Sequence, residues 1–376
     1  MSLFDDYRHM ARALELAARG LHTTDPNPRV GCVIVRQGEI VGEGWHEVAG
    51  EPHAEVHALQ QAGERSRGAD VYVTLEPCSH HGRTPPCSQA LIDAGVARVI
   101  VAMQDLNPRV SGSGMARLRA AGIAVDCGIM QAEARALNPG FIMRMEQGRP
   151  HVRCKMAMSL DGRTAMASGE SRWISGEAAR HDVQELRARS SAIMTGINTV
   201  LMDDPSLTVR EVPRTGVYSA AATSLRQPLR VVLDAGLRMP FKARLLSAPG
   251  RTLILTGVAD QQAHSTLSKA GAEVVTLPLS SPGLLNLGAV LECLAQREVN
   301  ELLLESGPVL SGALLQAGLI DELVIYVAPM LMGDGARGLF HLPGLETLAQ
   351  KIPLHIIDQR QVGQDWRITA QVYREE

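Results

Sequence analysis

The stretch LEPCSHHGRTPPC, residues 75–87, begins where an apolar run, ADVYVTL, ends, and that run is typical of a buried strand. Cys78 follows a proline at the end of this predicted strand, and Cys87 opens the next predicted helix. The partial positive charge of a helix N-terminus favours the thiolate form of cysteine, which is the form that binds metal. The spacing therefore predicts two metal ligands, one at a strand end and one at a helix start.

A third candidate ligand lies upstream, in EPHAEVHALQQAG, residues 51–63. His53 stands at the start of this predicted helix, and Glu55 follows two residues later. Side chains two residues apart point to nearly opposite sides of a helix, so the pair can share a site only at the helix start. One histidine and two cysteines form a donor set that zinc prefers, and three protein ligands leave a fourth position for water. The sequence therefore predicts one catalytic zinc ion per chain, held by His53, Cys78 and Cys87.

Glu55 then has a role as the catalytic residue. Zinc lowers the pKa of a bound water to roughly 7, and a carboxylate that does not bind the metal can take the proton and deliver it to a leaving amine. The order His-x-Glu, then Pro-Cys, then a second cysteine is the signature of zinc nucleobase deaminases. In that signature two residues separate the cysteines, whereas eight residues separate them here.

Three other histidines compete for the role of ligand. His57 lies one turn further into the predicted helix, where packing or exposure to solvent is the simpler interpretation. His80 and His81 lie in the loop between the cysteines and are candidate substrate contacts. His-x-Glu alone or Pro-Cys alone is common by chance, and only their combination in this order favours zinc.

The composition is that of a globular protein with two domains. The chain has 376 residues, against roughly 100–200 for a usual domain. A net charge of −3 gives no bulk attraction to nucleic acid or an anionic membrane, and no apolar run approaches the length of a membrane span. The acidic, amphipathic N-terminus does not resemble a signal peptide. Six unevenly spaced cysteines do not form a disulfide framework, so we expect a cytoplasmic protein.

Alternating helices and strands predict an α/β architecture in both halves of the chain. The opening helix should place Met10, Leu14 and Ala18 on its buried face. A hairpin should follow in VGCVIVRQGEIVGEGW, with its turn at Gln37-Gly38. The polar, Gly-Pro-marked stretch MRMEQGRPHV suggests a junction, which predicts domains at residues 1–147 and 148–376.

The second half predicts seven strands, beginning with HVRCKMAMS, and helices at GEAARHDVQELRARS and VLSGALLQAG. The segment YSAAATSLRQP, residues 218–228, is typical of a surface insertion. In NELLLESGPVLSGALLQAG a buried strand ends at Glu305, Gly307 permits a tight turn and Pro308 suits the first helical position. Free N–H groups at such a helix start can hold a phosphate, although a strand-Gly-helix turn is usually only a turn. It is not the G-x-G-x-x-G fingerprint, so no Rossmann domain is implied.

Six motifs together resemble the bifunctional riboflavin-biosynthesis deaminase/reductase family over essentially the whole chain. The motifs are PNPRVG (26–31), GWHEVAGEPHAE (44–55), PCSHHGRTPPC (77–87), KMAMSLDGRTAMASGESRWIS (155–175), GINTVLMDDPSLTVR (196–210) and LLLESGPVLSGALL (302–315). The resemblance implies a cytidine-deaminase-like three-layer α/β/α domain followed by a dihydrofolate-reductase-like α/β domain. It also implies hydrolytic deamination of 2,5-diamino-6-(5-phosphoribosylamino)pyrimidin-4(3H)-one, then NADPH-dependent reduction of the ribosyl group to ribityl. A homo-oligomer, dimer or tetramer, is expected on the same ground.

The resemblance also implies roles for individual residues. Those similar to cofactor contacts are Ala157, Trp173, Thr199, Asp203 and the diphosphate cradle Gly307, Pro308, Val309, Leu310, Ser311, Gly312 and Ala313. Those similar to substrate contacts are Ser171, Arg187, Leu207, Arg210 and Glu305 in the second half, and Asn27 and His46 in the first. The two arginines also make physical sense, because a guanidinium fork suits a phosphate. No general acid is assigned in the reductase half, since hydride chemistry belongs to the cofactor.

Simpler interpretations stand beside these roles. Arg187 could lie on a solvated helix face, Trp173 could be a core aromatic, and Asp203 could belong only to a turn. A cytidine, guanine or tRNA-adenosine deaminase with an accessory domain is a rival enzyme, opposed by the long loop between the cysteines and by the reductase motifs. A nucleic-acid-binding module with structural zinc would need a fourth protein ligand and a basic face, and neither is evident.

Overall fold

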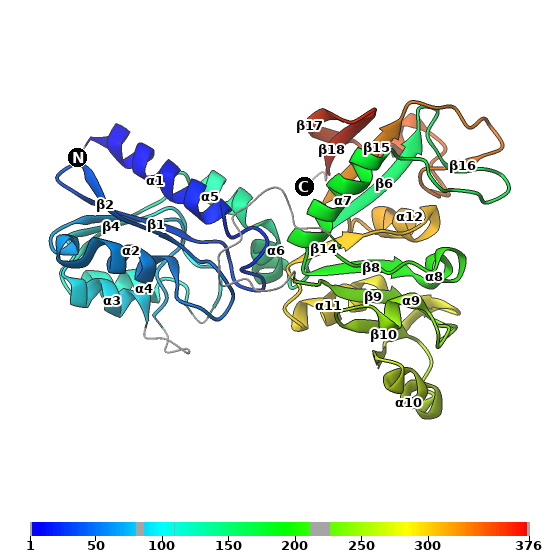
Figure 1. The fold of residues 1–376 in the computed structure, drawn as a ribbon, viewed down its shortest axis with the longest axis horizontal. Coiled ribbons are helices and arrows are strands. Elements are labelled where there is room, and N and C mark those ends of the chain that lie inside the picture. The colour runs from blue at the N-terminus through cyan, green and yellow to red at the C-terminus, as the bar shows by residue number, and fades with distance from the viewer. Residues whose placement is uncertain (1, 80–85, 109, 211–225, 374–376) are drawn as a thin grey trace. The chain divides into compact units, whose positions relative to one another are not determined.

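The computed structural model describes residues 2–79, 86–108, 110–210 and 226–373 (Figure 1). The chain divides into two compact units, the first reaching Gly148 and the second beginning at Arg149. His80, His81 and most of the predicted insertion at 218–228 lie outside the described residues. No helix in the described part of the chain is long and apolar enough to cross a membrane.

The first unit is built on a five-stranded sheet in the order β2-β1-β3-β4-β5. Its strands are β1 (Gly31–Arg36), β2 (Glu39–Trp45), β3 (Asp70–Val73), β4 (Arg98–Val101) and β5 (Ala124–Cys127). Strand β1 runs antiparallel to both of its neighbours, and β3, β4 and β5 are parallel to one another. The predicted hairpin is confirmed: Gln37 and Gly38 both have positive φ, as the twist of a two-residue hairpin turn requires.

Helices cover both faces of this sheet, which confirms the three-layer α/β/α arrangement (Figure 1). On one face lie α2 (Ala54–Ala62), α3 (Cys87–Ala94) and α4 (Ser113–Ala120). The other face is covered by α1 (Leu3–Ala18), α5 (Gln131–Leu137) and α6 (Pro139–Gln147), and a short 3₁₀ helix spans Gly63–Ser66. Alternate residues of the strands feed the two cores, as the period of two in a strand requires.

The buried face of α1 differs from the predicted one. Met10 is buried as expected, but Leu14 is only half-buried and Ala18 is exposed. Ala13 and Ala17 are buried in their place, because α1 lies very close to β1 at Gly31. A side chain at Gly31 would lie only 1.9 Å from the carbonyl oxygen of Ala13. The helix therefore turns its small residues toward the strand, which lets the two backbones approach closely.

The second unit contains a nine-stranded sheet in the order β11-β10-β9-β8-β14-β6-β15-β18-β17. The first seven strands in this order are parallel to one another, and β18 pairs antiparallel with both β15 and β17. Their bounds are β6 (His151–Ser159), β8 (Ala192–Gly196), β9 (Leu229–Leu233), β10 (Thr252–Thr256), β11 (Ala272–Thr276), β14 (Glu301–Leu304), β15 (Glu322–Ala328), β17 (Leu354–Val362) and β18 (Asp365–Val372). All seven predicted strands are present, and the β17–β18 hairpin was not predicted.

Helices also flank this sheet on both faces. On one face lie α11 (Leu287–Gln296) and α12 (Pro308–Gln316), and on the other α7 (Glu177–Arg189), α8 (Ile197–Asp203), α9 (Arg244–Ser247) and α10 (Gln261–Lys269). Two small sheets pair β7 (Arg163–Ala165) with β16 (Arg337–Gly338) and β12 (Leu279–Ser281) with β13 (Leu284–Leu285), and a 3₁₀ turn spans Leu348–Gln350. Because the parallel strands point the same way, their carboxyl ends share one edge of the sheet, where ligands of such folds bind.

Candidate functional site

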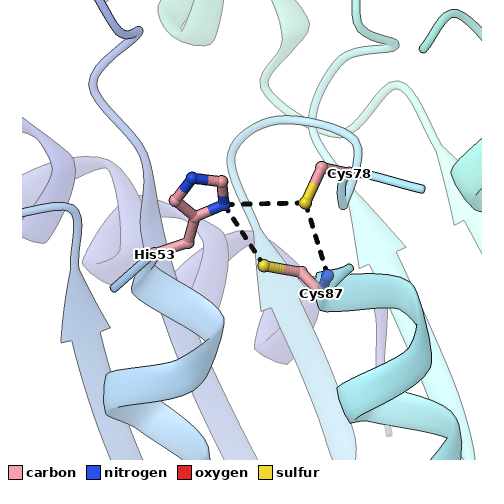
Figure 2. A group of neighbouring side chains, drawn as sticks. All are labelled: His53, Cys78 and Cys87. Atoms are coloured by element: carbon pink, nitrogen blue, oxygen red, sulfur yellow. Dashed lines mark hydrogen bonds between the residues drawn. The ribbon is translucent and has the colours of Figure 1, made fainter. Parts of the chain in front are cut away.

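The three predicted metal ligands meet in the first unit, as Figure 2 shows. His53 is the N-cap residue of α2, Cys78 lies in the irregular segment after β3, and Cys87 is the first residue of α3. The Nδ1 atom of His53 lies 3.6 Å from Cys78 Sγ and 3.3 Å from Cys87 Sγ. The three donor atoms lie within 4.8 Å of one another, and the described residues contain no other such group of three or more His, Cys, Asp or Glu. Two soft sulfurs and one imidazole nitrogen fit zinc.

The electrostatics of this group favour a bound cation. Hydrogen bonds from Cys87 and His53 lower the pKa of Cys78 to about 4, and the backbone N–H of Cys87 also donates to its sulfur. The hydrogen bond with Cys78 raises the pKa of His53 and of Cys87. The Cys78 sulfur is thus a thiolate that accepts hydrogen bonds from His53 and Cys87. A metal cation bound here would neutralise its negative charge.

Glu55 lies in the first turn of α2 and is 3% exposed. Burial raises the pKa of its carboxyl, and Cys87 lies close enough to share a hydrogen bond with it. The arrangement puts a carboxyl group beside the sulfur and nitrogen donors but outside the ligand group, as the proton-transfer role requires.

Asn27 and His46 lie in the same neighbourhood. The ring of His46 packs edge-on against the ring of His53, with 5.3 Å between centroids. Its Nδ1 lies 3.2 Å from the carbonyl oxygen of Pro52, and its Nε2 lies 3.0 Å from the side-chain nitrogen of Asn27. Burial lowers the pKa of His46 to about 4, so the ring is neutral, donating through Nδ1 and accepting through Nε2. His57 is half-buried and is not part of the ligand group.

The second unit holds a cleft of about 1680 Å³ at the carboxyl ends of its central strands. This is larger than the roughly 300–1,000 Å³ of most small-molecule sites, which suits two ligands. The predicted residues that line it are Ala157, Ser171, Trp173, Arg187, Thr199, Asp203, Leu207, Arg210, Glu305, Gly307, Pro308, Val309, Leu310 and Ala313.

Two residues of the predicted cradle, Ser311 and Gly312, do not line the cleft. The hydroxyl of Ser311 is buried and lies 2.9 Å from that of Ser306. A side chain at Gly312 would lie 2.1 Å from the carbonyl oxygen of His341, so this face of α12 packs directly on another backbone segment. Both residues therefore face the protein and not the cleft.

A buried ion pair forms one wall of the cleft. The Nε and Nη2 atoms of Arg187 donate to the two carboxylate oxygens of Glu305 at 2.6 and 2.9 Å, and its Nη1 donates to Thr208 O. Arg187 is therefore not a solvated helix residue. Trp173 is 68% exposed and stacks under the guanidinium of Arg180, so it is not a core aromatic. Asp203 ends α8 and lies 3.4 Å from Arg172.

Lys155 is a cleft residue that the sequence reasoning missed. Burial lowers its pKa, and the charges of Glu305 and Arg187 act on it. The sequence contained one signal for this role: Lys155 precedes the apolar residues MAM in the middle of a predicted buried strand. Lysine is rarely buried without a partner, so its position indicated a charged site.

Comparison with known proteins agrees with this division of the chain. The family model described as cytidine and deoxycytidylate deaminase zinc-binding region matches residues 4–103, and that of the RibD C-terminal domain matches residues 150–367. The chain is 53% identical to the riboflavin biosynthesis protein RibD of Escherichia coli over 363 residues, covering 96% of this chain and 97% of that protein. Against RibD of Haemophilus influenzae the identity is 48% over 362 residues, covering 96% and 95%.

Solved structures show the same likeness over the full length. Acinetobacter baumannii RibD superposes with a TM-score of 0.91 at 45% identity, covering 99% of this chain and 100% of that one. The diaminohydroxyphosphoribosylaminopyrimidine deaminase/5-amino-6-(5-phosphoribosylamino)uracil reductase of Thermotoga maritima gives 0.83 at 30% identity, covering 98% and 99%. The chain belongs to the RibD family of bifunctional riboflavin-biosynthesis enzymes, with a zinc-binding deaminase domain followed by a reductase domain.

Proposed function

We propose that the chain deaminates 2,5-diamino-6-(5-phosphoribosylamino)pyrimidin-4(3H)-one and then reduces the ribosyl group of the product to ribityl with NADPH. The observation that carries the first step is the convergence of His53, Cys78 and Cys87 on one point, with the buried carboxyl of Glu55 beside them. The large cleft with its buried ion pair supports a separate second step. Family membership supplies the substrate.

In the deaminase site, His53, Cys78 and Cys87 would hold a zinc ion, which supplies a water of lowered pKa. Glu55 then takes the proton of the attacking water and returns it to the departing amine. Both ring nitrogens of the neutral His46 are engaged, with Pro52 O and with the side-chain nitrogen of Asn27, so His46 holds the Asn27 amide beside the ligand group, and the amide oxygen of Asn27 orients the pyrimidine. Burial of His46 keeps bulk water from competing for its bond with Asn27.

In the reductase cleft, the start of α12 fits the diphosphate of a dinucleotide. Gly307 is the N-cap residue, no side chain caps the helix, and Pro308 occupies the first helical position. The first N–H groups of this nine-residue helix are thus left for an anion. A side chain at Gly307 would meet nothing within 4 Å, so the approach is open. We assign the cofactor contacts Ala157, Trp173, Thr199 and Asp203, and the substrate contacts Ser171, Leu207 and Arg210, to the same cleft.

The choice of NADPH has support that the sequence did not offer. Strand β14 separates β6 from β8 and β9. With the diphosphate at α12, we place the nicotinamide toward β6, where Lys155 and Glu305 line the cleft, and the adenosine toward β9. At the β9 end, Arg238 lines the cleft and donates to Asn198 Oδ1 at 2.9 Å. Among the described residues no carboxylate forms an ion pair with it within 4.0 Å, and the buried carboxylate of Asp234 fixes its turn by accepting from Met239 N–H. A guanidinium held this way suits the 2′-phosphate of NADPH.

Calorimetry with NADP⁺ and NAD⁺ tests this assignment without turnover. Arg238→Ala should weaken NADP⁺ binding about 10–100-fold, the equivalent of a charge-assisted hydrogen bond, and leave NAD⁺ binding nearly unchanged. Arg244→Ala is a matched control, because Arg244 lines the same cleft but lies 3.9 Å from the carboxylate of Asp204. Equal loss for both cofactors in Arg238→Ala contradicts the role.

A coupled assay on the ribosylamino-pyrimidine phosphate tests the two activities, with ammonia release and NADPH oxidation followed separately. Cys78→Ser should abolish ammonia release and lose zinc, because one of three ligands is gone. The same variant should still oxidise NADPH when it is given the deaminated compound. Ammonia release that survives in Cys78→Ser overturns the zinc assignment.

We also propose that the protein forms a homo-oligomer in the cytoplasm. Leu354, Ile356 and Ile357 lie together near the start of β17, the last strand of the sheet, and are 45–55% exposed. Such a patch of apolar side chains is typical of an interface, and a mass measurement by light scattering tests it. The free state of all six cysteines suits a reducing compartment.

A further inference from the structure

Glu76 is buried in the segment between β3 and the metal ligand Cys78. It belongs neither to the metal ligands nor to the proton-transfer step assigned to Glu55. It is 3% exposed, and its carboxylate accepts four backbone N–H groups from a single segment of chain. Oε2 accepts from Asp105 at 3.2 Å and from Gly112 at 2.9 Å. Oε1 accepts from Gly114 at 2.9 Å and from Met115 at 3.1 Å. All four donors lie between the end of β4 and the first turn of α4.

This carboxylate does the work of a helix cap from a distant position. The N-cap residue of α4 is Gly112, which has no side chain and leaves the first N–H groups of the helix without a local partner. A negative charge at a helix N-terminus is favourable, and four N–H groups satisfy both carboxylate oxygens. The helix start is therefore fixed by the side-chain carboxylate of Glu76 and not by a capping residue of its own.

The contact continues into the residues that follow Glu76. A side chain at Gly114 would lie 2.0 Å from the carbonyl oxygen of Pro77, so the helix start rests directly on the Pro77 backbone. One residue beyond Cys78, the hydroxyl of Ser79 lies 2.5 Å from that of Ser113. The chain on both sides of the metal ligand Cys78 is thus packed against the start of α4.

Regular structure does not hold Cys78, because β3 ends at Val73 and residues 74–79 belong to no helix or strand. Its carbonyl oxygen accepts from Ser88 N–H at 3.1 Å, which ties it to α3. Glu76 N–H donates to Met103 O at 3.0 Å, which ties the preceding turn to β4. The side chain of Glu76 adds the tie to α4, so Cys78 is positioned by three elements at once.

We propose that Glu76 is a positioning residue of the deaminase site, whose carboxylate fixes the start of α4 against Pro77 and thereby sets where Cys78 presents its sulfur. The inference deepens the proposed deaminase function and rests on it. Because Glu76 is not one of the three ligand residues and its carboxylate is bonded to backbone N–H groups, its effect is expected in the geometry of the metal site and in turnover, and not in the metal stoichiometry.

Glu76→Gln in the full-length protein is the sharpest test, because it keeps the shape and replaces one acceptor oxygen by a donor. Two of the four N–H groups then face an NH₂ group. We expect zinc to remain at one per chain and kcat for ammonia release to fall about 10–100-fold, the usual effect of disturbing groups behind metal ligands. NADPH oxidation with the deaminated compound should stay at the wild-type rate, which controls for the integrity of the chain.

Cobalt substitution gives a readout that does not depend on activity. In Glu76→Gln the thiolate-to-cobalt and ligand-field absorption bands should shift, because Cys78 has moved. Gln104→Ala is the control, since it removes a bond from Gln104 to Ser111 on the exposed side of the same loop and should leave both kcat and the spectrum unchanged. Unchanged kcat and an unchanged cobalt spectrum in Glu76→Gln would falsify the proposal and leave Glu76 a purely structural cap.

A second variant keeps the test decisive if Glu76→Gln does not fold. Gly114→Ala pushes α4 away from Pro77 and leaves the carboxylate intact, and it should shift the same cobalt bands. A wild-type spectrum in a folded Gly114→Ala protein overturns the link between α4 and Cys78. A wild-type protein that binds metal but releases no ammonia refutes the deaminase function instead, while the cobalt comparison still decides the role of Glu76.

Discussion

Glu55 is the residue on which the proposed deamination most directly depends. It is buried in the first turn of α2, two residues after the proposed ligand His53, and lies outside the proposed ligand group. We predict that Glu55→Gln keeps one zinc ion per chain and loses about 10²–10⁴-fold in kcat for ammonia release, the usual contribution of a general acid–base group. Metal content and the ammonia assay measure the two quantities. Loss of the metal, or a change in kcat below about tenfold, contradicts the role.

Site residues could be predicted from the sequence where their order and spacing along the chain indicated a shared site. His53, Cys78 and Cys87 could be predicted because a strand end and two helix starts bring such residues to one edge of a sheet. The role of Glu76 could not be predicted, because its partners are backbone N–H groups about 30 to 40 positions further along the chain. Every residue except proline has such a group, so the side-chain identities do not indicate the contact. Lys155 was missed for a related reason: its burial in a charged cleft depends on segments far away in the chain.

At the scale of elements, Arg187 on α7 and Glu305 after β14 join a helix to the central sheet. Burial alone would raise the pKa of Glu305, but the Arg187 guanidinium, together with the charges of Lys155 and Arg210, outweighs burial and holds the pKa below its ordinary value. The charged form of Glu305 therefore stabilises the fold above the unfolded pKa, near 4.3. That stability is lost as the pH falls through the lowered folded-state pKa.

We predict that Glu305→Gln lowers the stability of the second unit at neutral pH by about 3–5 kcal/mol, because Arg187 stays buried without its partner. The gap between wild type and variant should close as the pH falls below about 4. Denaturant unfolding of both proteins over a pH series measures the gap. A gap that is constant from neutral pH down to about pH 2.5 contradicts the lowered pKa, since Glu305 would then bind protons equally in the folded and the unfolded state.

Elements with strong periodicity were predictable, and elements that use unusual packing were not. The hairpin at Gln37-Gly38 and the seven parallel strands follow from turn chemistry and apolar runs. Strand β17 has the sequence LHIIDQRQV, in which apolar residues do not alternate and most side chains are exposed. The face of α1 was misplaced because its orientation depends on the close approach to Gly31, which hydrophobicity alone does not encode.

At the scale of the whole molecule, the two activities should be separable. Each unit has its own sheet and its own apolar cores, and the predicted boundary near Gln147 lies beside the division at Gly148. We predict that residues 1–147 release ammonia without NADPH. A fragment of residues 148–376 keeps Arg149, whose guanidinium pairs with Asp321 at 2.8 Å, and should oxidise NADPH only with the deaminated compound. A folded second fragment that fails to bind NADPH refutes the reductase assignment.

The position of β6 in the chain affects the order in which the two sheets can fold during translation. The first sheet is assembled from strands that are all complete by Cys127, so it can form as soon as that stretch has left the ribosome. Strand β6 leads the second unit but pairs with β14 and β15, which are translated about 150 residues later. Nascent chains stalled near residue 280 should therefore resist protease up to the junction and be cut beyond it, and the reductase can appear only once the last strands have emerged.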